Sequence, residues 1–239
     1  MAENLNSYLE YVNAPWGKLF YEIVWKQLEE PNGKEILDFG SGFGVTASHL
    51  AEKNNVTAVE PDEEMIKSRF CNNQYKQIIG GYDWIKREPS NKYDIIICHN
   101  VLEYVNNRAE IICEFARLLK PEGILSVVKH NRLGKVMQKA VFEYKIDEAF
   151  ALLDGENVKS NNFGTISTYD NEDLANYSKG KFYIDKCFGV RTFYALQNND
   201  VKTAPDWMDK MLELELKASA VAQFRDVAFF NHVILRKSL

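Results

Sequence analysis

Short apolar runs alternate with longer segments of helical periodicity over most of the chain. The apolar runs lie at residues 35–39, 55–60, 77–80, 93–99 and 124–128. The run at 93–99, Tyr-Asp-Ile-Ile-Ile-Cys-His, is nearly continuous, which is typical of a strand buried on both faces. One or two helices are expected within 5–30, another from the glycine turn after 39 to about 53, and others at 61–72 and 108–119. This alternation is typical of βαβ units and predicts an α/β fold.

The pattern is less regular in the second half of the chain. It falters from about 131 to 168 and resumes with a helix near 171–177. Strands are expected near 182–189 and 191–195, a helix at 205–222 and a final strand at 228–235. Because little sequence separates the last strands, we expect the sheet to close with an antiparallel edge.

The glycine turn after the first strand is the strongest candidate site. It reads Asp38-Phe39-Gly40-Ser41-Gly42-Phe43-Gly44, and ligands of open α/β sheets bind at such strand ends. The spacing is G-x-G-x-G without a following Gly-Lys-Ser/Thr, which excludes an NTP phosphate cradle and disfavours a dinucleotide turn. The Asp38 carboxylate would repel phosphates and favour a ligand with an ammonium or sulfonium group. The alternative is a tight turn that serves packing alone.

Further acidic and aromatic side chains follow the next two strands. Glu60 comes 22 positions after Asp38, where an acidic residue of a doubly wound fold accepts both ribose hydroxyls of an adenosine. Met65 lies a helical turn later and is either an adenine contact or a core residue. Tyr82 and Asp83 come after the third strand, where the carboxylate either bonds the adenine amine or belongs to an exposed turn.

In their order and spacing, these motifs resemble those of class I S-adenosylmethionine-dependent methyltransferases. The resemblance covers about 35–128 and includes 37–44, Val59-Glu60, Tyr82-Asp83, 93–105 and 118–125. It implies a Rossmann-like seven-stranded, mostly parallel sheet with an antiparallel last strand, helices on both faces and a small cap. It also implies S-adenosyl-L-methionine as the cofactor, bound by Asp38, Gly40, Ser41, Gly42, Glu60, Pro61, Met65, Tyr82, Asp83 and His99.

A finer resemblance points to the bacterial tRNA 5-carboxymethoxyuridine methyltransferases, which esterify the carboxylate of a modified wobble uridine. It rests on short segments at 99–105, 129–134, 189–193 and 212–215. The segment Gly17-Lys18-Leu19-Phe20 is also similar, but Phe20 stands where that group is expected to have a cofactor-contacting arginine.

Polar residues at the expected strand ends are candidates for orienting the acceptor. The four favoured as catalytic are His99, His130, Asn131 and Arg191, and Asn100, Tyr104, Arg132 and Tyr194 lie nearby in sequence. A carboxylate acceptor needs a cation to orient it and no base, whereas a hydroxyl or amine acceptor would use His99 or His130 as a base. The alternative for His99 is a hydrogen-bonded histidine at a strand end. For His130 and Asn131 it is the start of a loop, and for Arg191 it is a structural ion pair. We read the other two histidines, His49 and His232, as structural.

Composition and charge add expectations about domain number, partners and location, and they leave the predicted fold and cofactor unchanged. The 239 residues are 46% hydrophobic with a net charge of −5, which suits one folded domain and argues against a general nucleic-acid coat. Residues 129–145 nevertheless hold five basic residues and one acid, which fits either a cap that binds RNA or a solvated helix face. The polar N-terminus, the absence of long apolar stretches and the four scattered cysteines favour a cytoplasmic protein with no membrane partner and no metal.

The sequence is thus interpreted as one methyltransferase domain over 1–239. Its expected parts are leading helices at 1–30, a cofactor-binding core at 35–128, a cap at 129–168 and the rest of the sheet at 169–239. The favoured acceptor is a modified uridine carboxylate in tRNA, and the alternative is a small-molecule metabolite; no DNA partner is expected. A catalytically silent S-adenosylmethionine-binding module and a nicotinamide-dependent dehydrogenase are weaker alternatives.

Overall fold

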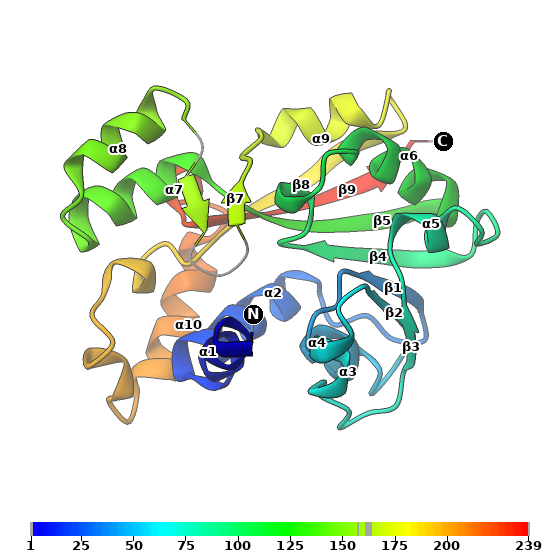
Figure 1. The fold of residues 1–239 in the computed structure, drawn as a ribbon, viewed down its shortest axis with the longest axis horizontal. Helices are drawn as coiled ribbons and strands as arrows, with labels where there is room; N and C mark the ends of the chain where they lie inside the picture. Colours follow the sequence, from blue (N-terminus) through cyan, green and yellow to red (C-terminus); the bar gives the residue numbers. More distant parts are fainter. Residues whose placement is uncertain (1, 157, 161–163, 239) are drawn as a thin grey trace. The chain divides into compact units, whose positions relative to one another are not determined.

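A seven-stranded sheet organises the computed structural model, which describes residues 2–156, 158–160 and 164–238 (Figure 1). The strand order is β3-β2-β1-β4-β5-β9-β8. The pairs β1–β2, β1–β4, β2–β3 and β4–β5 are parallel, and the arrow of the last strand, β9, points against that of β4 in Figure 1. The strands of this sheet are β1 (Glu35–Phe39), β2 (Asn55–Glu60), β3 (Lys76–Ile79), β4 (Tyr93–His99), β5 (Leu119–His130), β8 (Phe182–Val190) and β9 (Phe230–Lys237). The predicted α/β fold with an antiparallel last strand is confirmed.

Helices separate these strands along the chain. They are α1 (Ala2–Asn13), α2 (Pro15–Gln27), α3 (Val45–Leu50), α4 (Glu63–Lys67), α5 (Tyr82–Ile85), α6 (Arg108–Leu118), α7 (Arg132–Met137), α8 (Ile146–Leu153), α9 (Asn171–Tyr177), α10 (Trp207–Ala218) and α11 (Ala222–Val227). Short 3-10 helices are η1 (Leu102–Tyr104), η3 (Tyr194–Leu196) and η4 (Val201–Thr203), and η2 (Gln138–Phe142) is a π-helix. Strands β6 (Val158–Ser160) and β7 (Gly164–Ile166) pair antiparallel as a second sheet. Over the described residues, we find no helix that combines the length and apolar character of a membrane span.

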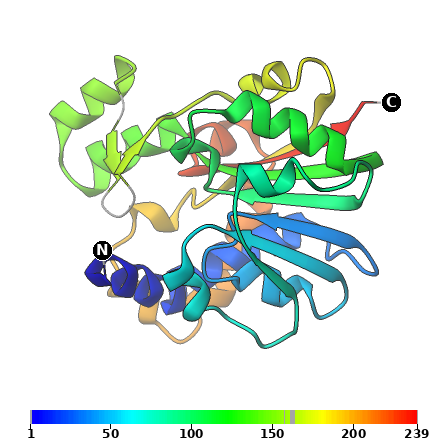
Figure 2. The same cartoon turned by 45° about the vertical axis from the view of Figure 1, so that its right-hand side comes forward.

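The chain divides into two compact units. Unit 1 comprises Met1–Gln27, Lys129–Tyr169 and Cys187–His232, and unit 2 comprises Leu28–Val128, Asp170–Lys186 and Val233–Leu239. Within unit 2, helices α6 and α9 lie side by side in both views (Figures 1 and 2). The sequence-based parts at 1–30, 35–128, 129–168 and 169–239 remain a prediction.

Local sequence explains why the main elements form where they do. In β4, Ile95, Ile96, Ile97 and Cys98 are all buried, as the continuous apolar run predicts. Helix α2 starts at Pro15, whose missing N–H is harmless in the first turn. Helix α9 begins with a capping box, in which the Asp173 carboxylate accepts the Asp170 backbone N–H at 2.8 Å.

Two predicted boundaries around the first half of the sheet are wrong. The helix expected at 61–72 is only the five-residue α4, which begins after Asp62 caps the Glu64 and Met65 N–H groups. Pro61 therefore lies before this helix. Strand β5 begins at Leu119, not at residue 124, because residues 119–123 also belong to the strand. A positive φ of 60° at Glu122 and a register shift opposite Tyr93–Ile95 accommodate the irregularity.

Two elements of the second half also differ from the prediction. Residues 191–195 are no strand, because Arg191 adopts a φ of +63°, and the turn continues into η3. The helix expected at 205–222 ends at Ala218, and α11 follows after Ser219, whose hydroxyl donates to the Leu216 carbonyl at 2.9 Å. The segment 131–168, expected to be irregular, contains α7, η2, α8, β6 and β7.

Candidate functional site

The turn between β1 and α3 in unit 2 is built by three glycines with positive φ. Gly40, Gly42 and Gly44 have φ values of 76°, 53° and 68°. Side chains are excluded at two of them: a Cβ would lie 2.3 Å from Val101 Cγ2 at Gly40, and 2.0 Å from Tyr75 Oη at Gly44. At Gly42, the nearest described atom to such a Cβ is Met65 Sδ at 3.8 Å. The space in front of Gly42 is therefore open, as a backbone cradle for a ligand requires.

Two buried carboxylates lie behind this turn. Asp38 and Glu60 are 4% and 7% exposed; Asp38 is the penultimate residue of β1, and Glu60 ends the neighbouring β2. Burial, together with the negative charge of Glu60, raises the pKa of Asp38 to about 7, although the Ala47 N–H lowers it. Burial also raises the pKa of Glu60. Two buried carboxylates without a cation are electrostatically unfavourable, and a bound cation would relieve them.

Glu60 holds the turn in shape and keeps acceptor capacity. Its Oε2 accepts the Gly42 N–H at 2.8 Å, and its Oε1 accepts the Asp62 N–H at 3.0 Å. Each carboxylate oxygen has a second lone pair, so both can also accept a hydroxyl of a diol. Met65 is buried near Gly42, and Pro61 is exposed just beyond β2. The structure thus groups Asp38, Gly40–Gly44, Glu60 and Met65 at one end of the parallel strands.

Three buried side-chain oxygens near the glycine turn of unit 2 have no hydrogen-bond partner among the described residues. They are Asp38 Oδ2, Ser41 Oγ and Asn100 Oδ1. Asn100 follows β4 with a φ of +55°, held by its N–H bond to the Val128 carbonyl at 2.8 Å. Buried polar atoms are normally satisfied, so three orphans around one turn fit a bound group that supplies donors.

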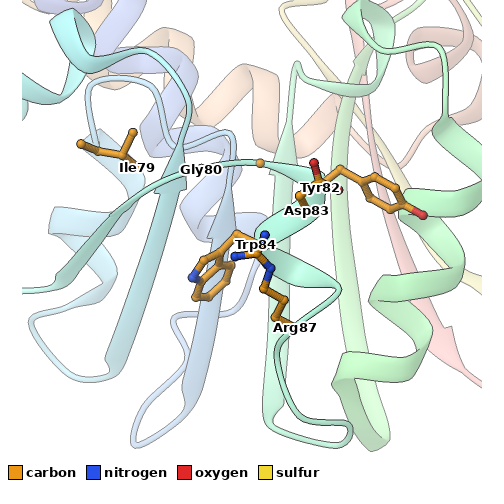
Figure 3. A pocket seen from close by; sticks show the side chains of 7 residues that line it. Ile79, Gly80, Tyr82, Asp83, Trp84 and Arg87 are labelled. Atoms are coloured by element: carbon orange, nitrogen blue, oxygen red, sulfur yellow. The ribbon is translucent and has the colours of Figure 1, made fainter.

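A pocket of about 400 Å³ lies beside the short helix α5 (Figure 3). Its lining includes both predicted residues, Tyr82 and Asp83, together with Ile79, Gly80, Gly81, Trp84 and Arg87. Asp83 is exposed and forms an ion pair with Lys86 at 2.8 Å, which lowers the pKa of its carboxyl. In Figure 3, Trp84 and Arg87 lie together while the Tyr82 ring extends away from them. The indole of Trp84, which follows Asp83 in the sequence motif, is a flat apolar surface of the kind that stacks on an adenine.

His99 ends β4 and is held by its neighbour strand. Its Nε2 lies 2.8 Å from Ser126 Oγ on β5. This contact is the strand-end hydrogen bond weighed as an alternative to a catalytic role.

Unit 1 holds the other three residues predicted to be catalytic. His130 packs on Phe229 and Phe230, with ring centroids 5.6 and 4.7 Å apart. The Asn131 amide donates to the carbonyls of Asp226 and Ala228, both at 2.8 Å, so both of its amide protons are used within the chain. Asn131 therefore fixes the start of α7 against the segment before β9.

Arg191 lies among aromatic rings in unit 1. Its Nη1 donates to Tyr11 Oη at 2.8 Å, and its guanidinium lies 4.6 Å from the Phe229 ring centroid. Its Nε is buried without a partner among the described residues. Lys202, which no sequence pattern singles out, is 5% exposed and has its pKa lowered to about 8 by burial and by the charge of Arg191.

Phe20, at the position expected from the finer resemblance to carry an arginine, is part of an aromatic cluster. It is buried and meets the rings of Tyr21 and Phe230 edge-on. Its surroundings in unit 1 are apolar, so this position supplies no cation.

Sequence comparison relates the core of the chain to methyltransferases. Residues 37–127 match the family model described as methyltransferase domain. The ubiquinone biosynthesis O-methyltransferase of Rickettsia canadensis is 34% identical over 105 residues, which cover 42% of this chain and 44% of that protein. The same-named protein of Rickettsia conorii is 31% identical over 134 residues, with 53% and 46% covered. The chain thus spans about half the length of the curated relatives that it matches.

Solved structures match over nearly the whole chain. A structure from Thermotoga maritima, described as a methyltransferase and possible histamine N-methyltransferase, gives a TM-score of 0.63 at 14% identity, covering 98% of this chain and 95% of that one. The cyclase SpnF gives 0.54 at 18% identity, with 91% and 79% covered. At these identities the likeness concerns the fold. The chain therefore has the Rossmann-like fold of S-adenosylmethionine-dependent methyltransferases, and its residues 37–127 match their methyltransferase domain.

Proposed function

We propose that this protein is an S-adenosylmethionine-dependent methyltransferase whose acceptor is a small molecule. The observation that carries the proposal is the buried pair Asp38 and Glu60 behind the open Gly42 turn, with no cation beside it among the described residues. The match of residues 37–127 to the methyltransferase domain supports the same conclusion.

The residues of the turn fit the parts of this cofactor. Asp38 Oδ2 and Asn100 Oδ1 would accept the protons of its ammonium group, and the Glu60 carboxylate would accept both ribose hydroxyls. Met65 and the pocket beside α5 would cover the adenine, with Asp83 at the amine as predicted. When bound, S-adenosylmethionine supplies an electrophilic methyl group on a positively charged sulfur. The task left to the protein is to hold the acceptor in line with that methyl group.

The names of the relatives favour a hydroxyl as the acceptor group. The curated proteins reported above are named O-methyltransferases of ubiquinone biosynthesis. A hydroxyl must lose its proton during transfer, whereas a carboxylate does not. Roles for His99, His130, Asn131 and Arg191 in this step remain predictions.

The basic segment at 129–145 offers little free charge to RNA. Lys129 and Lys135 are buried, and the Lys129 ammonium donates to the Tyr169 carbonyl at 2.6 Å. Lys139 and Lys145 both pair with Glu143 and Glu148, at 2.7 to 3.3 Å. Phosphate binding depends on cations that can release counterions, and these four are already buried or neutralised. This supports the small-molecule acceptor over tRNA.

A modified uridine carboxylate of tRNA is the second candidate acceptor. It is favoured by one observation, the buried guanidinium Nε of Arg191 that has no partner among the described residues. A cytoplasmic location is part of the proposal, and the scatter of the four cysteines along the sequence favours it.

The proposal is tested by methyl transfer from S-adenosylmethionine labelled in its methyl group. The intact protein is incubated with catechol, as a simple hydroxyl acceptor, and separately with tRNA known to carry the carboxylate. Label in a methylated catechol, lost in Asp38→Ala, is the expected result. Label in the tRNA and none in catechol would overturn the small-molecule acceptor, and label in neither, with intact cofactor binding, would favour the silent binding module.

A further inference from the structure

Two cations of unit 1, the buried Lys202 and the half-buried Arg191, form no ion pair with a described carboxylate. Arg191 lies at the end of β8, and Lys202 lies in η4. Arg191 donates to the Tyr11 hydroxyl, and Lys202 donates to Asn199 Oδ1 at 3.0 Å, so each has only a neutral oxygen as acceptor. Buried cations are normally paired, and two together are unfavourable.

The walls around these cations are aromatic. The Arg191 guanidinium lies 5.4 Å from the Tyr194 ring centroid and 4.6 Å from that of Phe229, and the Lys202 ammonium lies 5.6 Å from the ring of Trp16. Rings contribute some cation–π stabilisation, but they provide no hydrogen-bond acceptor in the plane of a guanidinium. They also exclude water, which strengthens any ionic interaction formed there.

Unused hydrogen-bond donors occur at the same place. The Tyr194 side chain is fully buried, and its hydroxyl has no partner among the described residues. Arg191 Nε is also buried and has no hydrogen-bond partner among the described residues. An N–H and an O–H, both beside a guanidinium charge and both without an acceptor, form a donor set for an anion.

The buried acid Glu215, whose charge acts on Arg191, serves another purpose. The Glu215 carboxylate in α10 accepts the backbone N–H groups of Thr192, Phe193 and Tyr194 at 3.0, 2.8 and 3.3 Å. It thereby fixes the turn that holds Arg191 at a φ of +63°, a strained conformation for a non-glycine residue. Glu215 therefore positions Arg191 by holding its turn through three backbone donors, and it acts on the Arg191 charge without forming an ion pair.

We propose that Arg191, Lys202 and Tyr194 form a binding site for a carboxylate, which is the acidic group of the acceptor substrate. The planar fork of Arg191 suits the two oxygens of a carboxylate, and Lys202 and the Tyr194 hydroxyl complete the donors. This inference rests on the proposed function in calling the ligand the acceptor, and it extends that function by naming an acidic acceptor class. The carboxylate can belong to a small aromatic acid or to a modified nucleoside.

The site is tested with benzoate as the probe, added to the full-length protein without cofactor. Nuclear magnetic resonance of 13C-methylated lysines follows the Lys202 signal, and its titration gives the pKa of that side chain. The charge beside Lys202 is Arg191, and the ionisable groups around Arg191 are Tyr11, Tyr194 and Glu215. Benzoate should raise the pKa of Lys202 above about 8, because an opposite charge favours the charged ammonium.

Variants separate this site from nonspecific binding. Lys202→Met should weaken benzoate binding about tenfold or more, and Tyr194→Phe, which removes one hydroxyl, should weaken it several-fold without unfolding the protein. The control Lys217→Met removes an exposed lysine that pairs with Glu213 and should change nothing. Benzyl alcohol, the uncharged analogue, should bind no more weakly to Lys202→Met than to wild type.

Other results would overturn the carboxylate site or identify the molecule that carries the carboxylate. Benzoate binding that is equal in wild type and Tyr194→Phe, or an unchanged pKa of Lys202, would overturn the carboxylate site. Preferential binding of inorganic phosphate would also overturn it. Two compounds are then compared as competitors of benzoate, a nucleoside with a 5-carboxymethoxy group and 4-hydroxybenzoate. If the nucleoside competes more than tenfold better, the carboxylate belongs to RNA. Calorimetry with S-adenosylmethionine on the same variants reports separately on the proposed cofactor.

Discussion

At the scale of single residues, Asp38 shows how a sequence motif acquires an electrostatic role. Its position before a glycine turn predicts a carboxylate at the end of the first strand. The sequence does not show that the carboxylate is 4% exposed, that the charge of Glu60 acts on it, or that its pKa is raised to about 7. These properties come from parallel pairing of β1 with β2, which brings two residues 22 positions apart to neighbouring strand ends.

Asp38→Asn is expected to stabilise the protein in the absence of cofactor. The folded-state pKa of Asp38 is raised from 3.8 to about 7, so its stability contribution is fully present below pH 3.8 and is lost as the pH rises to about 7. The variant should gain up to about 4 kcal/mol relative to wild type at pH 8 and little at pH 4. Urea unfolding at both pH values measures the difference. An equal effect at pH 4 and pH 8 would contradict the raised pKa.

Gly42→Ala is expected to fold and to bind S-adenosylmethionine at least about tenfold more weakly. The added Cβ meets no described atom closer than Met65 Sδ at 3.8 Å, so it projects into the space kept open for a ligand. Gly33→Ala is the matched control, because Gly33 also has a positive φ, 66°, and no described atom within 4 Å. Both variants should lose about 1 kcal/mol of stability from the positive φ, and only Gly42→Ala should lose affinity. Equal affinity in the two variants would contradict the cradle.

At the scale of elements, regular strands were predictable and irregular ends were not. β1, β2 and β4 match the apolar runs residue for residue, because buried parallel strands carry continuous apolar sequences. The turn at 191–194 looks like a strand in sequence, since Val190, Thr192 and Phe193 favour extended structure. Its actual conformation depends on Glu215 from α10, a contact that no local pattern encodes.

Helix α2 is joined to the strands of unit 1 through a buried histidine. His232 Nδ1 lies 2.8 Å from Gln27 Oε1, and Gln27 Nε2 donates to the Gly189 carbonyl at 3.2 Å. Burial lowers the pKa of His232 to about 3, so the ring is neutral in the folded protein. The structural role expected for His232 from the sequence agrees with this network.

His232 is therefore expected to contribute less stability as the pH falls below 6.5, whereas Asp38 contributes more over the same range. A histidine with a lowered folded pKa contributes stability that is present above its unfolded pKa and is lost as the pH decreases toward about 3. The loss is about 1.4 kcal/mol per pH unit. The stability of His232→Gln relative to wild type should therefore rise by about 1.4 kcal/mol per pH unit as the pH falls from 6.5 to 4.5, as measured by urea unfolding. A relative stability that stays constant over this range would contradict the lowered pKa of His232.

At the scale of the whole molecule, charge counts along the sequence are a poor guide to surfaces. The excess of basic residues at 129–145 suggests an RNA-binding cap. In the structure, two of the five lysines and arginines are buried, and two pair with Glu143 and Glu148. The partner Glu148 lies outside the segment, so folding and not composition decides how much charge is free. Arg191 and Lys202, which form no ion pair with a described carboxylate, are far from this segment in sequence.

The double variant Lys139→Gln/Lys145→Gln is expected to leave the affinity for tRNA within about twofold of wild type at 50 mM salt. Both lysines are already paired with glutamates, so their removal releases few additional counterions from RNA. Filter binding over a range of salt concentrations measures affinity and its slope. A loss of more than about tenfold, or a slope reduced by about two, would contradict the neutralised cap and revive the tRNA acceptor.

The Asp38 and Glu60 carboxylates and the Gly42 turn form the proposed binding site for S-adenosylmethionine. Isothermal titration calorimetry with this compound, on the wild-type protein and on Glu60→Ala, tests it most directly. We expect one binding site in the wild type and at least about a hundredfold weaker binding in Glu60→Ala, since the ribose hydroxyls and the turn lose their shared acceptor. Equal affinity in a folded Glu60→Ala protein, or no binding to the wild type, would contradict the proposed site.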